Sequence, residues 1–283
     1  MQRKTLHKQY KKLGISAVRR IGFSFFAVIL IGSILLSLPM SHSVHSTSSY
    51  LDHLFVATSA TCVTGLVTHV TASEYTLFGQ IVIILLIQIG GLGFLTLMSM
   101  FFVLLKRKLT YANKIVMQEA LNRNSLNETG IYIKRVIKYT VCFELIGAIC
   151  LAFVFIPQFG ILKGIYYSLF HAISAFCNAG FDLMGSISGQ FSSLTSLYDN
   201  SLVMITVSLL IILGGLGYPV ILDVLHTRSL KKLTIHSKLV ITSTIILLLI
   251  GFVFILGVEY NNPDTLGNMD MKGKLLSSMF QTT

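Results

Sequence analysis

The sequence contains few charged residues and no tryptophan. Only 12% of its 283 residues are Asp, Glu, Lys or Arg, which is about half the share of an average soluble protein. Hydrophobic residues make up 53% of the chain, and its mean hydropathy is +0.76. So few charges cannot cover the surface of a water-soluble globule. Because helices satisfy their own backbone hydrogen bonds in lipid, we expect an all-α polytopic membrane protein.

The sequence also lacks the usual signatures of metal and hydrolase chemistry. Its four cysteines form no CxxC pair, so neither a disulfide framework nor a zinc site is indicated. No GxGD, GxSxG or HExxH pattern occurs, which argues against an intramembrane hydrolase. His42, His45 and His53 lie close together, but no cysteine or acid completes a ligand spacing. We therefore expect no enzyme, and a non-transporting membrane scaffold remains one alternative.

Five long apolar segments predict membrane-spanning helices. The first could be a signal peptide, but Leu38-Pro39-Met40 offers no small-residue cleavage site, so we expect a retained helix. The predicted spans are residues 21–38, 76–105, 135–156, 201–225 and 239–258.

Lys and Arg gather in alternate connecting segments. Residues 1–20 carry seven of the 22 basic residues, 106–138 carry eight and 226–238 carry four, whereas 39–75 carry none. Since basic residues stay on the cytoplasmic side, this alternation predicts a multi-pass protein of the cell membrane with a cytoplasmic N-terminus. It also accounts for the net charge of +11. We therefore expect the lipid bilayer, and no nucleic acid, as the partner of these residues.

Two apolar segments on the outer side resemble each other. Residues 50–60 and 164–175 are long enough for a few helical turns but too short to cross a bilayer. Their likeness indicates a repeated unit of helix, re-entrant loop and helix. At an offset of 115, Leu54, Phe55, Ala57, Ser59, Ala60, Cys62 and Gly65 match Leu169, Phe170, Ala172, Ser174, Ala175, Cys177 and Gly180.

The spans that follow repeat too, since residues 90–93 and 214–217 both read Gly-Gly-Leu-Gly. A third copy begins with the fifth span, and we expect it to continue beyond Thr283 because Phe280 takes the place of Phe55 and Phe170. The predicted organisation is a cytoplasmic basic N-terminus (1–20), a first unit (21–105), a cytoplasmic linker (106–134), a second unit (135–225), a second cytoplasmic linker (226–238) and a truncated third unit (239–283).

The loop after each short helix is a candidate cation site. A helix that enters from outside points its last carbonyls, and about half a negative charge, toward the membrane centre. Glycine permits positive φ, so carbonyls there can face an axis and replace the hydration shell of K⁺ or Na⁺. The alternative is a packing hairpin in which the glycines are ordinary turn residues. The candidate ion ligands are Cys62, Val63, Thr64, Gly65, Cys177, Asn178, Ala179 and Gly180.

The TxxTG pattern that ends at Gly65 and the CNAGF pattern of residues 177–181 carry a family resemblance. Across essentially the whole chain, the sequence resembles the Trk/Ktr/HKT superfamily of potassium transporters, and most of all its bacterial Ktr membrane subunits. The resemblance implies four non-identical helix–pore loop–helix units around one K⁺-channel-like pore, of which this chain holds about two and a half. Each unit would contribute one selectivity-filter segment with a key glycine, and Gly65 and Gly180 match the first two.

The same resemblance implies further properties. A serine at the first filter glycine goes with Na⁺ permeation in plant relatives, so Gly65 is similar to the K⁺-favouring version. The family also implies a homodimer that rests on a cytosolic ring of nucleotide-binding regulatory subunits. Its gating features in the later units cannot be mapped onto this chain.

We expect this chain to transport monovalent cations, chiefly K⁺ inward, without an organic cofactor. An alternative is a Na⁺- or H⁺-coupled symporter in which Glu144, the only acid well inside a span, is the coupling acid. We favour a structural role, in which Glu144 bonds to the backbone or a hydroxyl of a neighbouring short helix. The glycine runs at 90–93 and 214–217 fit either tight helix packing or a hinge. Asp223 is expected to be a solvated cap near the cytoplasmic end of its span.

Overall fold

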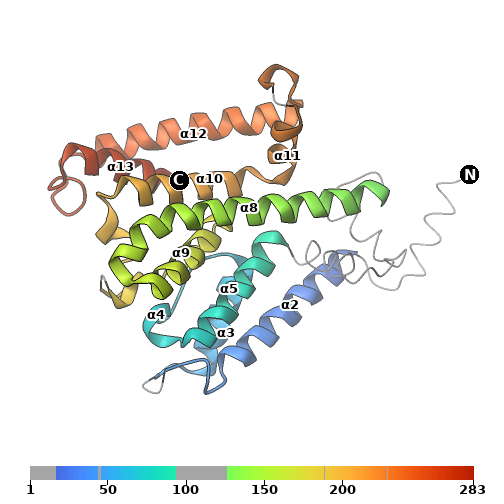
Figure 1. The fold of residues 1–283 in the computed structure, drawn as a ribbon, viewed down its shortest axis with the longest axis vertical. Helices are drawn as coiled ribbons and strands as arrows, with labels where there is room; N and C mark the ends of the chain where they lie inside the picture. The colour runs from blue at the N-terminus through green and yellow to red at the C-terminus, as the bar shows by residue number, and fades with distance from the viewer. Residues whose placement is uncertain (1–16, 44–45, 94–125, 188, 228) are drawn as a thin grey trace, which may run out of the picture.

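The computed structural model describes residues 17–43, 46–93, 126–187, 189–227 and 229–283. Helices dominate this part of the chain (Figure 1). The elements are α2 (Ala17–Leu36), α3 (Tyr50–Cys62), α4 (Thr71–Glu74), α5 (Leu77–Leu92), α8 (Leu126–Phe159), α9 (Ile161–Phe176), α10 (Ser201–Leu216), α11 (Tyr218–Thr227), α12 (Ile235–Glu259) and α13 (Met271–Thr282), with 3₁₀ turns η2 (Met184–Ser186), η3 (Thr195–Leu197) and η4 (Leu230–Lys232).

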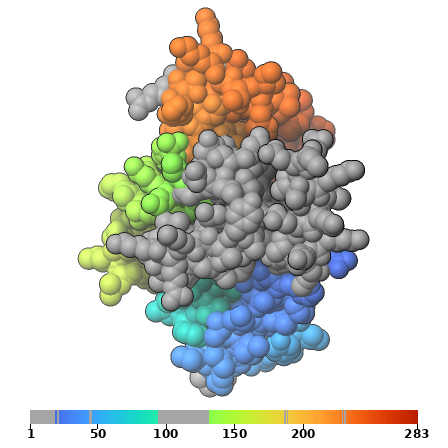
Figure 2. Space-filling model, turned by 90° about the vertical axis from the view of Figure 1, so that its right-hand side faces the viewer, coloured from blue at the N-terminus to red at the C-terminus, as the bar shows by residue number. Residues whose placement is uncertain are grey.

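The helices pack in the order in which they follow one another in the sequence. Helices α2, α3 and α5 form one group, α8, α9 and α10 form the next, and α12 and α13 lie against α10 (Figure 1). In the view turned by 90°, residues of the first group lie at one end and residues after 200 at the other (Figure 2). Each group thus contains a short helix, α3, α9 or α13, packed against longer apolar neighbours.

Some of the predicted spans are long enough to cross a membrane as single helices. Within α8, Ile131–Phe159 has the length and hydropathy of a span, and so does α12. The described parts of the first two spans, Gly22–Leu36 and Leu77–Leu92, are shorter apolar helices, and residues 94–105 of the second span lie outside the described part. These findings agree with an all-helical membrane protein.

The predicted span over residues 201–225 consists of two helices with a sharp bend between them. Helix α10 ends at Leu216, α11 begins at Tyr218, and the two axes differ by 97°. Gly217 lies between them with φ +81°, a conformation that glycine adopts without steric cost. The backbone therefore turns within the segment that hydropathy alone reads as continuous.

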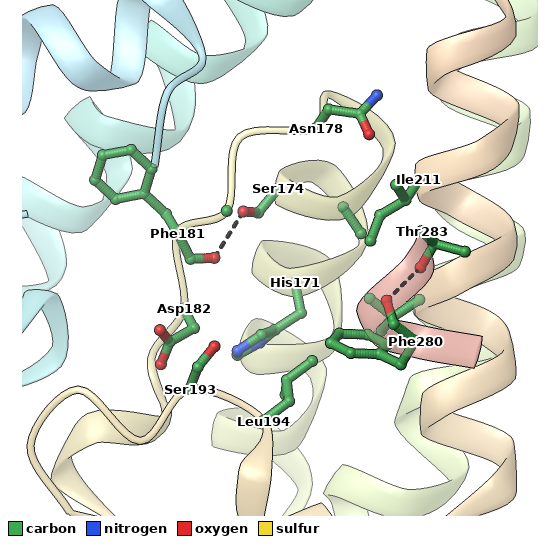
Figure 3. A pocket seen from close by; sticks show the side chains of 13 residues that line it. His171, Ser174, Asn178, Phe181, Asp182, Ser193, Leu194, Ile211, Phe280 and Thr283 are labelled. Carbon is green, nitrogen blue, oxygen red and sulfur yellow. Dashed lines mark hydrogen bonds between the residues drawn. The ribbon is translucent and has the colours of Figure 1, made fainter. Parts of the chain in front are cut away.

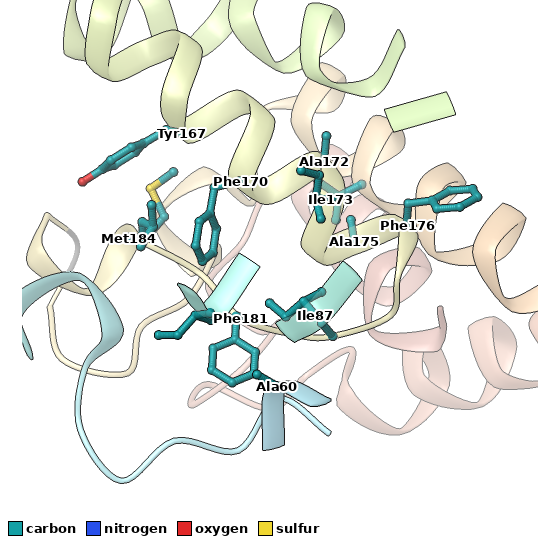
Figure 4. Close-up of a cluster of buried hydrophobic side chains, with 14 of the residues drawn as sticks. Ala60, Ile87, Tyr167, Phe170, Ala172, Ile173, Ala175, Phe176, Phe181 and Met184 are labelled. Carbon is teal, nitrogen blue, oxygen red and sulfur yellow. The ribbon is translucent and has the colours of Figure 1, made fainter. Parts of the chain in front are cut away.

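The hydrophobic core lies where the first two groups of helices meet. Ala60 and Ile87, from α3 and α5, lie close to Phe170, Phe176 and Phe181 from the second group (Figure 4). All five side chains are buried, and van der Waals packing of this kind holds helices together where no hydrophobic driving force acts between them. The short helices are thus enclosed by protein, whereas the spanning window of α12 is 0% buried and presents apolar side chains outward.

Two acidic side chains tie loops to helix ends. Glu74, at the end of α4, accepts hydrogen bonds from the hydroxyls of Ser46 and Ser48. Asp223, on α11, accepts from the backbone N–H of Thr234 at 3.0 Å and from its hydroxyl at 2.8 Å. Since Thr234 is the N-cap of α12, Asp223 joins α11 to the next helix. It is thus more than the solvated cap that the sequence predicts.

Candidate functional site

The loop after α3 has an unusual backbone. Helix α3 ends at Cys62, and Val63 adopts the left-handed conformation with φ +59°, which is rare for a β-branched residue. The N–H of Thr64 returns to the carbonyl of Ser59 at 2.9 Å, and its hydroxyl donates to the Ser59 hydroxyl at 3.0 Å. Gly65 follows with φ +77°.

The loop after α9 repeats this backbone 115 residues later. Asn178 has φ +57° and Gly180 has φ +71°. The N–H of Ala179 donates to the carbonyl of Ser174 at 2.8 Å, as that of Thr64 does to Ser59. The sequence repeat is therefore matched by a repeat of dihedral signs and hydrogen bonds, which an unrelated pair of packing hairpins would not share.

The two loops meet at their glycines. A Cβ atom on Gly65 would lie 2.5 Å from the carbonyl oxygen of Ala179 and 3.1 Å from the Cα of Gly180. A Cβ on Gly180 would lie 3.4 Å from the Cα of Gly65. The loops thus approach so closely that a side chain at position 65 has no room.

The glycine runs after each loop pack tightly against the preceding short helix. A Cβ on Gly90 would lie 2.2 Å from the carbonyl oxygen of Thr61, and one on Gly214 would lie 1.8 Å from that of Phe176. Thr61 and Phe176 are themselves 115 residues apart. The tight-packing interpretation therefore holds for Gly90 and Gly214, while the bend at Gly217 agrees with the hinge interpretation.

Helix α10 also contacts the second loop through a side chain. In the amide orientation that satisfies both partners, the Asn178 side-chain nitrogen donates to the carbonyl of Ile211 and its oxygen accepts from the N–H of Gly215, both at 3.2 Å. In a regular helix that N–H and that carbonyl bond to each other. The Asn178 amide thus stands at the end of α10 just before the bend.

Glu144 lies in a buried polar contact between three elements. Its two carboxylate oxygens each accept from the Gln88 amide nitrogen at 2.8 Å. The Gln88 oxygen in turn accepts from the Cys177 thiol at 3.1 Å. Glu144 is 4% exposed, so its partner is a side chain of α5, and not the short-helix backbone or hydroxyl that we expected.

His171 supports the second loop from behind, a residue that sequence reasoning missed. It is buried on α9, where its Nδ1 lies 2.7 Å from the Tyr167 carbonyl and its Nε2 accepts from the Leu183 N–H at 3.3 Å. Ser174 donates to the Phe181 carbonyl at 2.6 Å (Figure 3). The available signal was a polar residue at the position where the first unit has Val56.

A cavity of about 280 Å³ separates the second loop from the end of α13 (Figure 3). It is lined by His171, Asn178 and Gly180 on one side and by Phe280 and Thr283 on the other. Helix α13 begins at Met271, 110 residues after the start of α9, which is also the offset between Phe170 and Phe280. Phe170 and Phe280 therefore lie at the same distance from the starts of α9 and α13.

Two of the three clustered histidines form a ring contact. His42 and His53 stack with ring centroids 5.3 Å apart, and the Nδ1 of His53 lies 3.0 Å from the Tyr75 hydroxyl. His45 lies outside the described residues. Within the described ranges, no three His, Cys, Asp or Glu residues are grouped so that they could hold a metal ion.

Comparison with known proteins places the chain in a family. Residues 16–266 match the TrkH family of cation transport proteins. The chain is 42% identical over 257 residues to the potassium/sodium uptake protein NtpJ of Enterococcus hirae. It is 39% identical over 261 residues to the Ktr system potassium uptake protein B of Bacillus subtilis and 37% identical over 266 residues to that of Vibrio alginolyticus.

These alignments cover 91%, 92% and 93% of this chain, but only 56%, 57% and 57% of the three relatives. The chain thus spans little more than half the length of these relatives. A family of transport proteins agrees with the expectation that the chain is not an enzyme. The family match and the three alignments show that the chain belongs to the TrkH family of cation transport proteins.

Proposed function

We propose that the protein carrying this chain transports monovalent cations, chiefly K⁺ inward, and that residues 62–65 and 177–180 line its ion path. The observation that carries the proposal is the matched pair of loops that meet at Gly65 and Gly180. In each loop, φ is positive, then negative, then positive over three residues, and such alternation of left- and right-handed residues can turn successive carbonyls toward the same side. Such carbonyls can replace the water around K⁺ or Na⁺.

The surroundings of the loops support this proposal. Helices α3 and α9 both end at the loops, so the negative ends of their dipoles lie there. Non-helical backbone at membrane depth is tolerated where it is enclosed by protein, and the core around Phe170 and Phe181 provides that enclosure. The relatives carry potassium and sodium uptake in their names.

We also propose the assembly that the resemblance implies. The protein would be a homodimer in the cell membrane with a cytoplasmic N-terminus. It would rest on a ring of cytosolic nucleotide-binding regulatory subunits. The word "system" in the names of the Ktr relatives supports a membrane component that works with another subunit, and the basic segments 1–20, 106–134 and 226–238 would face that partner.

The coupled-symporter alternative rests on Glu144. A buried acid inside a span is a candidate for ion or proton coupling. Its two short hydrogen bonds from Gln88 support a structural role instead. We therefore keep the uncoupled or gated ion path as the leading proposal.

Substitution of the two glycines tests the proposal. In the protein as its native gene encodes it, Gly65→Ser and Gly180→Ser should each lower K⁺ uptake relative to Na⁺ uptake. The reason is that a Cβ on Gly65 would displace the second loop. Gly160→Ser is a matched control, because Gly160 has φ +80° with open space around it. An unchanged K⁺/Na⁺ preference in both loop variants would refute the assignment of these loops to the ion path.

A further inference from the structure

A chain of three side chains connects the first and second helix groups directly behind the second loop. Glu144 belongs to α8, Gln88 to α5 and Cys177 to the loop itself. The links are 2.8 Å from the Gln88 nitrogen to each Glu144 oxygen and 3.1 Å from the Cys177 sulfur to the Gln88 oxygen. The loop is thus anchored to a helix of the preceding unit.

The direction of these hydrogen bonds is determined by Glu144. Both carboxyl oxygens of Glu144 accept from the amide nitrogen of Gln88, so Glu144 holds that nitrogen on its own side. The amide oxygen must then face the loop, where it accepts the thiol proton of Cys177. Without the acid, the Gln88 amide could rotate and present donors to a thiol that it now accepts from.

Backbone packing holds the same cysteine from a second direction. A Cβ on Gly91 would lie 2.5 Å from the Cys177 sulfur and 2.7 Å from its Cβ. One residue earlier, Phe176 stacks on Phe143 of α8 with centroids 5.9 Å apart. The start of the second loop is therefore fixed between α5 and α8, and Gln88 supplies the polar contact.

We propose that Gln88 and Glu144 are positioning residues that set the K⁺ over Na⁺ preference of the second loop. The inference rests on the proposed function, since it concerns the same ion path. A site that selects between two ions by the size of its coordinating cage must keep its ligands within about 0.5 Å of the selective geometry. A loop released at Cys177 can close around the smaller ion, so the preference for K⁺ decreases.

The test is competitive K⁺ and Na⁺ uptake by the protein as its native gene encodes it, normalised to the amount in the membrane. Gln88→Leu and Glu144→Leu should each lower the K⁺/Na⁺ preference about fivefold, the worth of one lost hydrogen bond. The K⁺ concentration for half-maximal uptake should rise by a larger factor than the factor by which the maximal rate falls. Glu144→Gln keeps an acceptor for Gln88 and should lie between the native protein and Glu144→Leu.

Gln80 provides a matched control on the same helix. It is a buried glutamine, whereas Gln88 is half-buried, and it makes two hydrogen bonds, to the Tyr75 carbonyl at 2.8 Å and from the Tyr166 hydroxyl at 2.9 Å. Gln80→Leu should reduce the amount of protein but leave the ion preference as it is. An equal loss of preference in Gln80→Leu would overturn the proposal, because general destabilisation would then explain both.

A double-substitution cycle separates the route through Cys177 from other effects. If Gln88 acts through the thiol, the double variant Gln88→Leu with Cys177→Ala should lose no more K⁺/Na⁺ preference than the single variant with the larger loss. Additive losses would overturn the proposal. So would an unchanged preference in the Gln88 and Glu144 variants when Gly180→Ser alters it.

If the glycine variants also leave the K⁺/Na⁺ preference unchanged, the proposed function itself fails. If Gln88→Leu does not reach the membrane, the K⁺/Na⁺ preference of Glu144→Leu is compared with that of Gln80→Leu, and a loss in the first alone supports the proposal.

Discussion

Gly214 lies directly against the carbonyl oxygen of Phe176. A Cβ atom at Gly214 would stand 1.8 Å from that oxygen, whereas one at the neighbouring Gly215 would have its nearest contact, the side-chain amide of Asn178, at 3.8 Å. The end of α9 and the end of α10 are thus in contact through one glycine and not through the next. This difference gives a stability test with a control one residue away.

We expect Gly214→Ala to destabilise the protein by about 1–3 kcal/mol, because the added methyl group forces α9 and α10 apart. Gly215→Ala should be neutral or stabilising by up to about 1 kcal/mol, since alanine favours a helix and the site has room. Thermal unfolding of the purified protein in detergent would measure both. Equal melting temperatures for the two variants would contradict the close contact.

Asp223 leads to a prediction about the turn between α11 and α12. Asp223→Ala removes the acceptor of the Thr234 N–H and hydroxyl and of the Ser237 hydroxyl. The first turn of α12 should then open more often, and trypsin should cut after Lys231 or Lys232 faster than in the native protein. His226→Gln, at an exposed site on the same helix, should leave the cleavage rate unchanged. Equal protection in both variants would argue against a link through Asp223.

Glu74 predicts a dependence of stability on pH at the end of α4. Burial raises the pKa of Glu74, but the hydrogen bonds from Ser46 and Ser48 outweigh it, so the pKa lies below its ordinary value. A group with a lowered folded pKa stabilises the fold above the ordinary glutamate pKa of about 4.3. That contribution is lost as the pH falls through the lowered value.

The native protein should therefore be more stable than Glu74→Gln at neutral pH, and the difference should shrink as the pH decreases below about 4. Melting temperatures between pH 7 and pH 3 would show the convergence. Asp199→Asn, at an exposed position of another loop, serves as the control and should run parallel to the native protein. A gap between the native protein and Glu74→Gln that widens in acid would refute the role of the two serines.

The coupling alternative makes a separate prediction for Glu144. If the acid only positions Gln88, Glu144→Gln should lower K⁺ uptake by a similar factor at every pH, because one weakened hydrogen bond does not depend on a proton gradient. Uptake by membrane vesicles with and without an imposed pH gradient would measure this. Loss of a gradient response that the native protein shows would favour proton coupling instead.

The repeated loops were predictable because they depend on local residues. Glycine favours the positive φ at positions 65 and 180 in both units, and the offset of 115 links them in the sequence. Helices α3, α9 and α13 were predicted from short apolar segments, and their positions agree with the structure. The filter role of the loops, the division into units and the expected four-unit pore stay predictions.

Other features depend on contacts between distant segments. The sequence places Gln88, Glu144 and Cys177 on three separate segments, with 56 and 89 residues between Gln88 and its two partners. Nothing in their spacing indicates that they meet. His171 was missed for the same reason, because its partner Leu183 lies beyond the loop that it supports.

The sequence by itself determined that the chain is a helical membrane protein with repeated short helices, since hydropathy, basic clusters and glycine positions are properties of local composition. Only the tertiary structure decided which glycine lets two helices approach closely and which one bends the chain. It also decided which polar side chains meet in the interior. Gly214 and Gly217 belong to one Gly-Gly-Leu-Gly run, yet one contacts Phe176 and the other turns the chain by 97°. The physical reason is that packing acts on the neighbours that folding brings together, and those neighbours are not adjacent in the sequence.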